Sequence, residues 1–144
     1  MSNTATLQAL FAAVESGDWA TVDNLVGDQF QIFGAAPTPE NKAQWVDRHK
    51  SISAAFSDFA FNAANFNEEN DEVTAFVTIT GTHDGTLDLE AHGVSGLAAT
   101  GTRVELPQAM VIAKVESGKV TNLVVHGPDH GGLAGILEQI GASA

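Results

Sequence analysis

The sequence predicts an α+β fold, in which a curved antiparallel sheet wraps around N-terminal helices and forms a conical α+β barrel with one pocket. Apolar residues recur at helical spacing from Leu7 to Phe56, and from Phe59 onward apolar and polar residues alternate as they do in strands. Helices followed by a run of strands are typical of this class. The length of 144 residues and a hydrophobic fraction of 44% suit one domain, residues 1–144, with one core.

Two short helices are expected at the N-terminus. The first carries an apolar stripe that stops at Ser16-Gly17, a plausible helix end. The second starts at once, because the Asp18 side chain can accept hydrogen bonds from the first free amides of a helix. Its own stripe runs from Trp19 to Val26 and stops before Gly27-Asp28. The pattern therefore predicts two helices before any strand.

A short strand and a third helix are expected next. Residues 29–33, QFQIF, alternate as a strand does. Thr38 is expected to cap the third helix, with Pro39 at its first position, where the missing N–H of proline is tolerated. The apolar stripe of this helix includes a histidine, and its members are Trp45, His49, Ile52 and Phe56.

Strands are expected over the second half of the chain. EVTAFVTIT at 72–80 and RVELPQAMVIAKV at 103–115 both show a period of two. Ser117-Gly118 is a tight-turn pair, so the last of these strands and KVTNLVV at 119–125 should form a hairpin. A short apolar helix from Leu133 to Ile140 then follows.

Composition argues against several classes of function. Six Lys and Arg against eighteen Asp and Glu give a net charge of -12, so we expect neither a nucleic-acid partner nor a membrane partner. No apolar run reaches the roughly 20 residues of a membrane span, and the start, MSNTATLQAL, lacks the basic region of a secretion signal, so a cytoplasmic location is expected. Without cysteine, the chain has no disulfide and no thiolate ligand.

Residues 124–132, VVHGPDHGG, bring His126, Asp129 and His130 to the place where a strand leaves the core. A carboxylate and an imidazole at the mouth of an apolar cavity could move protons, because desolvation raises the pKa of an aspartate. In the alternative, Asp129 only caps the last helix. A metal site is not favoured, since the glycine and proline after His126 break the regular spacing that would align the three side chains.

Five strings along the chain carry a family resemblance: AAFSDFAF (54–61), TITGTHDG (78–85), GLAATGTRVELP (96–107), ESGKVTNL (116–123) and LAGILEQIG (133–141). With them the chain resembles the SnoaL-like polyketide cyclase and ester cyclase family of the nuclear-transport-factor-two-like (cystatin-like α+β) superfamily. Members typically end the third helix with Ala-Phe-x-Asp, carry Gly-Thr-His at a strand end, and close with a helix ending in Gln-hydrophobic-Gly. The resemblance covers nearly the whole chain.

This resemblance implies an apolar pocket for a polyketide, terpenoid or similar ring-bearing molecule, acid–base chemistry without a cofactor, and often a homodimer. The acid–base aspartate of the cyclases lies near the end of the last long strand, where Asp129 matches best. The histidine of Gly-Thr-His falls on His83, and His126 is expected to act beside them. Many relatives carry Glu-His-Trp at residues 122–124 and an aspartate or histidine pair at residues 31–33, and here both sets of polar groups are missing.

Further candidates come from the faces of helices and strands. His49 interrupts an apolar stripe, so it must find a partner in the core or face a cavity. Gln108 could orient a ligand carbonyl, unless it is an edge-strand amide beside Pro107. His83 could instead be a rim histidine that hydrogen-bonds a loop carbonyl. The large apolar side chains that we expect to line the pocket, or to serve as core, are Phe33, Trp45, Phe59 and Met110.

The leading hypothesis is a cofactor-independent acid–base enzyme that acts on a small hydrophobic carbonyl-containing or cyclic metabolite, with no metal. Asp129 would carry the proton, and His83, His126 and His49 would polarise oxygens or tune the aspartate. The first alternative is a non-catalytic protein that binds a small molecule in the same cavity. The second is a dimerising accessory domain whose cavity is filled by its own side chains.

Overall fold

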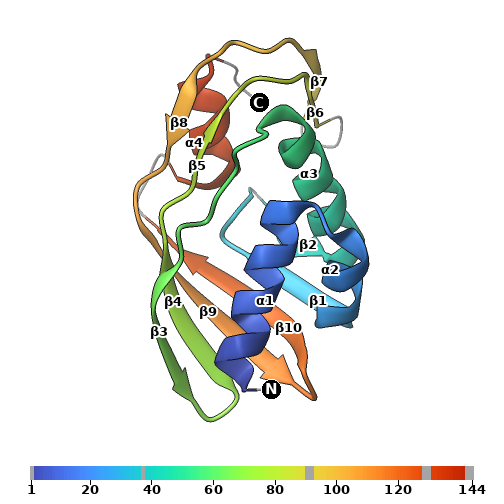
Figure 1. Ribbon diagram of the computed structural model, residues 1–144, viewed down its shortest axis with the longest axis vertical. Coiled ribbons are helices and arrows are strands. Elements are labelled where there is room, and N and C mark those ends of the chain that lie inside the picture. The colour runs from blue at the N-terminus through green and yellow to red at the C-terminus, as the bar shows by residue number, and fades with distance from the viewer. Residues whose placement is uncertain (1, 37, 90–92, 128–130, 142–144) are drawn as a thin grey trace.

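The predicted α+β class is confirmed: in the computed structural model, N-terminal helices cover one face of a curved, unclosed sheet (Figure 1). The structure describes residues 2–36, 38–89, 93–127 and 131–141. In chain order, the elements are α1 (Asn3–Ser16), α2 (Trp19–Leu25), β1 (Val26–Phe33), β2 (Glu40–Asn41), α3 (Lys42–Ala55), β3 (Ala64–Glu69), β4 (Glu72–Val77), β5 (Thr80–Thr82), β6 (Leu87–Leu89), β7 (Val94–Leu97), β8 (Arg103–Glu105), β9 (Ala109–Glu116), β10 (Lys119–His126) and α4 (Gly132–Gln139).

The main sheet has six strands in the order β2-β1-β10-β9-β4-β3. Its neighbouring strands are antiparallel, except that β1 and β10 run parallel. The expectation of a wholly antiparallel sheet was therefore wrong for this pair. Two strands can pair in parallel when a long connection joins them, and here residues 34–118 connect β1 to β10. The pairs β5–β8 and β6–β7 lie with α4 at the end of the molecule opposite the N-terminus (Figure 1).

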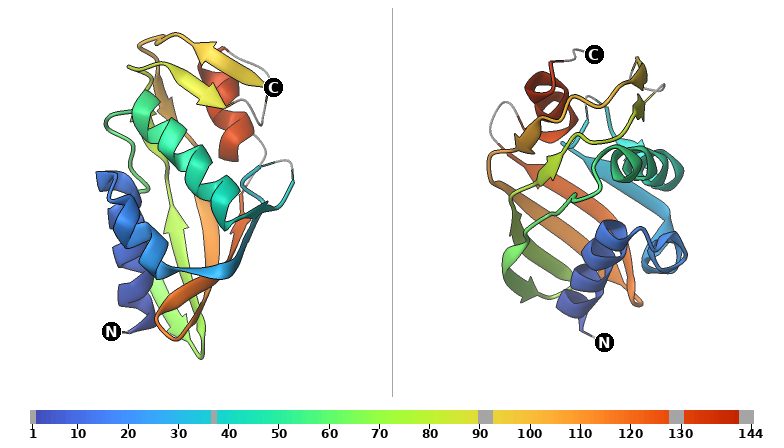
Figure 2. Two further views of the ribbon diagram at one scale, coloured as in Figure 1. Left: turned by 90° about the vertical axis from the view of Figure 1, so that its right-hand side faces the viewer. Right: turned by 45° about the horizontal axis from the view of Figure 1, so that its top comes forward.

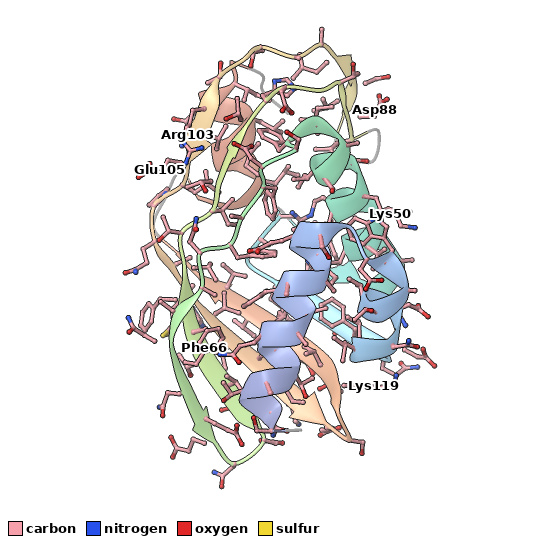
Figure 3. All side chains as sticks on the ribbon, in the orientation of Figure 1. Lys50, Phe66, Asp88, Arg103, Glu105 and Lys119 are labelled. Carbon is pink, nitrogen blue, oxygen red and sulfur yellow. The ribbon has the colours of Figure 1, made fainter. Side chains whose placement is uncertain are left out.

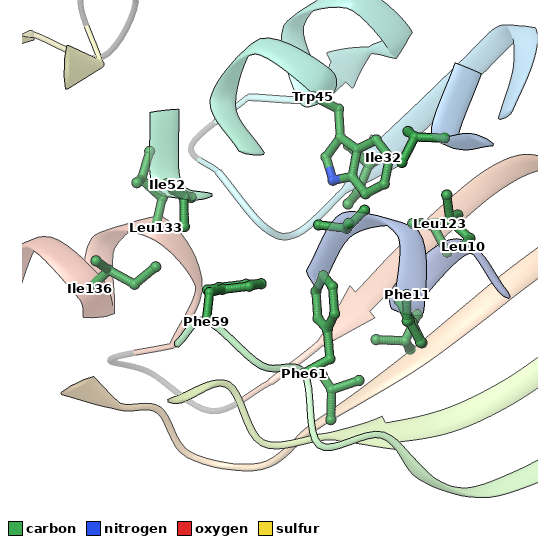
Figure 4. Close-up of a cluster of buried hydrophobic side chains, with 14 of the residues drawn as sticks. Leu10, Phe11, Ile32, Trp45, Ile52, Phe59, Phe61, Leu123, Leu133 and Ile136 are labelled. Atoms are coloured by element: carbon green, nitrogen blue, oxygen red, sulfur yellow. The ribbon is translucent and has the colours of Figure 1, made fainter. Parts of the chain in front are cut away.

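The core lies between the helices and the sheet. Helices α1, α2 and α3 lie on the same side of the sheet (Figure 2). Figure 4 shows the side chains that meet there, among them Leu10 from α1, Trp45 from α3, Leu123 from β10 and Ile136 from α4, all of them buried. In the part of the chain that the structure describes, no helix is both long enough and apolar enough to span a membrane.

Helix α3 starts three residues later than the sequence pattern predicted. Its cap is Asn41, whose side-chain oxygen accepts from the Gln44 amide at 2.9 Å, while the Gln44 side chain accepts from the Asn41 amide at 2.9 Å. This reciprocal capping box satisfies two amides and outcompetes the expected Thr38-Pro39 start. Glu40 consequently leaves the helix and lies in β2, opposite Ile32 of β1.

Turn chemistry explains the strand boundaries. The predicted hairpin of β9 and β10 is confirmed. Ser117 and Gly118 have φ values of 54° and 74°, and positive φ at both positions is typical of the two-residue turn whose twist matches that of the strands. The predicted strand at 103–115 is divided into β8 and β9 around Pro107, which cannot donate to a ladder.

Some residues of the strings that carry the family resemblance hold distant elements together by hydrogen bonds, which we call clasps. The Asp58 carboxylate accepts from the Thr82 amide at 2.6 Å and from the Thr82 hydroxyl at 3.0 Å, so it joins the end of α3 to β5. The Gln139 side chain pairs with both backbone groups of Glu105, at 2.9 and 2.8 Å, and so fixes α4 against β8. These contacts explain why the strings indicate a fold.

The sheet face turned away from the helices carries partly exposed apolar side chains, which we call the outer face. The strand register aligns them in adjacent rows, with Val124 opposite Ile112 and Met110 opposite Phe76. Its apolar members are Phe33, Phe76, Met110, Ile112 and Val124.

Substitution of the observed cap should destabilise the fold, and substitution of the expected cap should not. Asn41→Ala removes a capping-box oxygen, so we expect a loss of about 1 kcal/mol in the free energy of unfolding, measured by urea denaturation. Thr38→Ala, at an exposed position outside the helix, is the matched control and should stay within roughly 0.5 kcal/mol. Equal effects of the two substitutions would show that the capping box does not determine where α3 begins.

Candidate functional site

An apolar cavity of about 70 Å³, which we call the inner cavity, lies between α3, α4 and the sheet. This volume is room for a few water molecules. Figure 4 shows how aromatic and aliphatic side chains from several elements converge here. Apolar residues that line it include Phe11, Ile32, Trp45, Phe59, Phe61 and Ile136.

A wider opening of about 580 Å³, which we call the outer cleft, adjoins the inner cavity. Its described lining includes His126, Gly127 and Gly131. Four residues line both spaces, namely Pro107, Ala109, Val125 and Gly132. Small-molecule sites usually measure 300–1,000 Å³, so the inner cavity alone is small and the outer cleft has the usual size. A ligand that reached the inner cavity would extend into the outer cleft.

Glycines bring backbone against backbone at the rim of the outer cleft. Gly34 has a φ of +90°, and a Cβ there would collide with the Val125 carbonyl oxygen. Gly132 has a φ of +62°, and a Cβ there would come within 2.7 Å of the Ala35 carbonyl oxygen. The same oxygen accepts from the Leu133 amide at 2.9 Å, so α4 is tied directly to the loop after β1. Residues with side chains would push this rim apart.

His49 lies in the wall of the inner cavity and is only 5% exposed. Its ring is surrounded by Trp45, Phe59 and Phe61, with centroids 5.0, 5.7 and 5.7 Å away. No described residue hydrogen-bonds its Nδ1 atom. Burial holds the pKa of His49 well below its ordinary value, and the charge of Arg48 lowers it further. The imidazole is therefore neutral at neutral pH, with one ring nitrogen that can donate a hydrogen bond and one that can accept.

Arg48 brings a buried charge to the same wall. The residue is 6% exposed, and its Nε atom donates to both carboxylate oxygens of Glu40, at 2.9 and 3.2 Å. Burial lowers the pKa of Arg48 and the Glu40 carboxylate opposes that shift, so the guanidinium stays charged. Its Nη2 atom has no hydrogen-bond partner among the described residues. One edge of the guanidinium is thus satisfied, and Nη2 is left without an acceptor.

Sequence reasoning missed Arg48, although a signal existed. Arg48 lies three residues after Trp45 and four before Ile52, so it belongs to the apolar stripe of α3. A charged residue on such a stripe calls for a buried partner. That partner is Glu40, which the expected helix start at Pro39 would put in the first turn of the helix and which the structure places in β2.

The structure brings together only part of the predicted site. Trp45, His49 and Phe59 line the inner cavity, and the exposed His126 lines the outer cleft. Asp129 lies outside the described residues, as does His130 of the H-x-x-D-H string. Within the described ranges, no three histidine or acidic side chains gather as a metal would require.

His83 lies apart from both spaces. It is fully buried and stacks on Phe56 with a centroid distance of 5.3 Å. Its Nδ1 atom accepts from the Thr100 amide at 3.3 Å and lies 2.9 Å from the Thr100 hydroxyl, and Nε2 has no partner among the described residues. His83 therefore ties β5 to the connection before β8. This is close to the alternative of a histidine that hydrogen-bonds a loop, with a threonine in place of a carbonyl.

Three predicted pocket residues do not line the inner cavity or the outer cleft. Met110 and Phe33 belong to the outer face, and Gln108 is exposed. The correction follows from strand alternation, because Ala109 and Val111 face the cavity and their neighbours therefore face away. On β1 likewise, Ile32 faces inward and Phe33 outward.

The neutral state of His49 should make the fold less stable in acid. Because the folded pKa lies below the unfolded value of about 6.5, only the unfolded chain binds this proton as the pH falls below 6.5. We expect the unaltered chain to lose up to about 1.4 kcal/mol of unfolding free energy per pH unit relative to His49→Gln, which cannot titrate. Urea denaturation of both proteins at pH 8, 6 and 5 measures this difference. A difference independent of pH would contradict a depressed pKa.

Comparisons with known proteins support the fold. No curated protein matches the chain. Among solved structures, IdmH, a proposed polyketide cyclase from Streptomyces antibioticus, is 20% identical with a TM-score of 0.71, over 99% of this chain and 100% of that chain. AclR, a proposed hydroxylase from Streptomyces galilaeus, is 19% identical with a TM-score of 0.73, over 96% and 80%. A protein of unknown function with a cystatin-like fold from Xanthomonas campestris is 13% identical with a TM-score of 0.69, over 100% of both chains.

At such identities, the likeness to these structures shows the fold alone. The family is shown by the sequence itself, since the profile of the SnoaL-like polyketide cyclases matches residues 4–134, nearly the whole chain. The chain therefore belongs to the SnoaL-like polyketide cyclase family.

Proposed function

We propose that this chain is a cofactor-independent acid–base enzyme that acts on a small hydrophobic carbonyl-containing or cyclic metabolite. The observation that carries the proposal is the wall of the inner cavity, where His49 and Arg48 are buried among apolar side chains with polar atoms that have no described partner. Unpaired buried polar atoms cost free energy, and enzymes retain such groups at sites where a ligand pairs with them.

The reaction would be a proton transfer next to the carbonyl group. A base removes the proton from the carbon beside the carbonyl, and negative charge then develops on the carbonyl oxygen. Donors in an apolar, water-poor wall stabilise that charge more strongly than donors in water. The neutral imidazole of His49 and the apolar rings around it supply such surroundings.

Asp129 remains our candidate for the proton carrier. The family resemblance supports this role, and so do its neighbours in sequence, since His126 and Gly127 before it and Gly131 and Gly132 after it line the outer cleft. A ligand that extends from the inner cavity into the outer cleft would pass these four residues.

Substitution of Asp129 should abolish proton transfer and preserve binding. We expect the unaltered chain to accelerate exchange of the α-protons of 2-tetralone, an apolar cyclic ketone, for deuterium in heavy water, followed by nuclear magnetic resonance. Asp129→Asn should lower this rate by about 100-fold or more, because it removes the base and keeps the shape. Asp47→Asn, at an exposed position on α3, is the control and should leave the rate unchanged. Exchange at full rate in Asp129→Asn would remove this residue from the mechanism.

The alternative is a non-catalytic protein that binds the same class of molecule. The family resemblance implies a polar pair at residues 31–33. Ile32, the residue of this segment that lines the inner cavity, is apolar, and this favours the alternative. Binding of 2-tetralone and related ketones, together with an exchange rate no faster than in buffer, would support the binding protein over the enzyme.

We also propose that the outer face packs against a second copy of the chain. The family resemblance implies a homodimer, and the rows of partly exposed apolar side chains on the outer face would be covered by the same rows of a partner related by twofold symmetry.

Light scattering should therefore give twice the chain mass of 15.0 kDa. Ile112→Lys, in the middle of the outer face, should yield the monomer, because it would bury an unpaired charge in the interface. Lys50→Glu on α3, where the side chain points away from the body of the molecule (Figure 3), is the control and should remain dimeric. A monomeric unaltered chain would contradict the dimer.

A further inference from the structure

The guanidinium of Arg48 is only partly used by the fold. A guanidinium carries five N–H donors in a planar fork, and here the Nε donor is bonded to Glu40. Nη2 is buried, has no described partner, and belongs to a residue that lines the inner cavity. The missing partner must be an acceptor, because arginine has no acceptor to offer.

Charge narrows the class of acceptor. Glu40 already balances the charge of Arg48, and His49 is neutral, so the described wall of the inner cavity carries no net charge. A carboxylate ligand would add an unbalanced negative charge inside an apolar wall, which is unfavourable. A ketone oxygen accepts the same hydrogen bond without that penalty. When a neighbouring proton leaves, the charge that develops on this oxygen lies next to the guanidinium.

We propose that Nη2 of Arg48 binds the carbonyl oxygen of the ligand and that this chain therefore selects neutral hydrophobic ketones and enones over the corresponding acids. Glu40 is a positioning residue, because its bonds to Nε fix the plane of the guanidinium. Strand β2 holds Glu40 opposite Ile32, another residue of the cavity wall. This inference rests on the proposed function for the entry of a ketone into the inner cavity, and its test uses binding without turnover.

The test compares three probes that share a skeleton. Isothermal titration calorimetry measures binding of 2-tetralone, of tetralin, which lacks the oxygen, and of the carboxylate of tetralin-2-carboxylic acid. We expect the unaltered chain to bind 2-tetralone at least about tenfold more tightly than tetralin, as a charge-assisted hydrogen bond provides. The carboxylate should bind more weakly than the ketone.

Two variants locate the source of this preference. Glu40→Gln combined with Arg48→Met removes the guanidinium without leaving a buried unpaired charge, and it should bind 2-tetralone and tetralin equally. Arg48→Lys keeps the charge and loses the fork, so it should lose most of the preference while the fold is kept, as checked by circular dichroism. Phe59→Leu, elsewhere in the cavity wall, is the control and should weaken both probes alike.

Three results would overturn the inference: equal or absent binding of 2-tetralone and tetralin by the unaltered chain, tighter binding of the carboxylate, or an undiminished ketone preference in folded Arg48→Lys. The proposed enzymatic function can fail while this inference holds. In that case the chain would bind ketones selectively but would not catalyse deuterium exchange.

Discussion

The interaction on which the site depends is the buried ion pair of Arg48 and Glu40. Two charges that leave water lose hydration free energy, and their mutual attraction offsets this loss only when the geometry is good. A buried ion pair in an apolar wall is therefore weak evidence of a role in stability. Here the pair lies where the start of α3 meets the sheet. The capping box of Asn41 and Gln44 starts α3 at Lys42, and Glu40 therefore lies in β2, just before the cap of the helix that carries Arg48.

The fold turns this pair into a candidate binding site. The curved sheet and the helices enclose an apolar space, α4 closes part of it through Ile136, and glycines let the backbone segments at the rim of the outer cleft pack closely together. The hydrogen bonds of Asp58 with Thr82 and of Gln139 with Glu105 hold the connections around the apolar space in place. Two of the resemblance strings thus help to hold the connections around the pocket, and the polar groups on α3 are the basis of the proposed recognition.

Periodicity and turn chemistry predicted much of this from the sequence. The helical stripe with Trp45 and His49 and the hairpin at Ser117-Gly118 needed only local rules. The site needed contacts between segments: the partner of Arg48 comes from a two-residue strand too short to give a pattern. Gln108 follows Pro107 at the break between β8 and β9, where local alternation does not decide between the cavity and the exposed edge that it occupies. The Gly-Thr-His string that points to His83 says nothing of Thr100, which the histidine contacts 17 residues later.

The most direct measurement of this account is a crystal structure of the chain with 2-tetralone bound. The account predicts the ketone oxygen about 3 Å from Nη2 of Arg48, within hydrogen-bonding distance, with the ring system extending from the inner cavity toward the outer cleft. An inner cavity filled by its own side chains, or a ketone oxygen directed into the outer cleft away from Arg48, would contradict it.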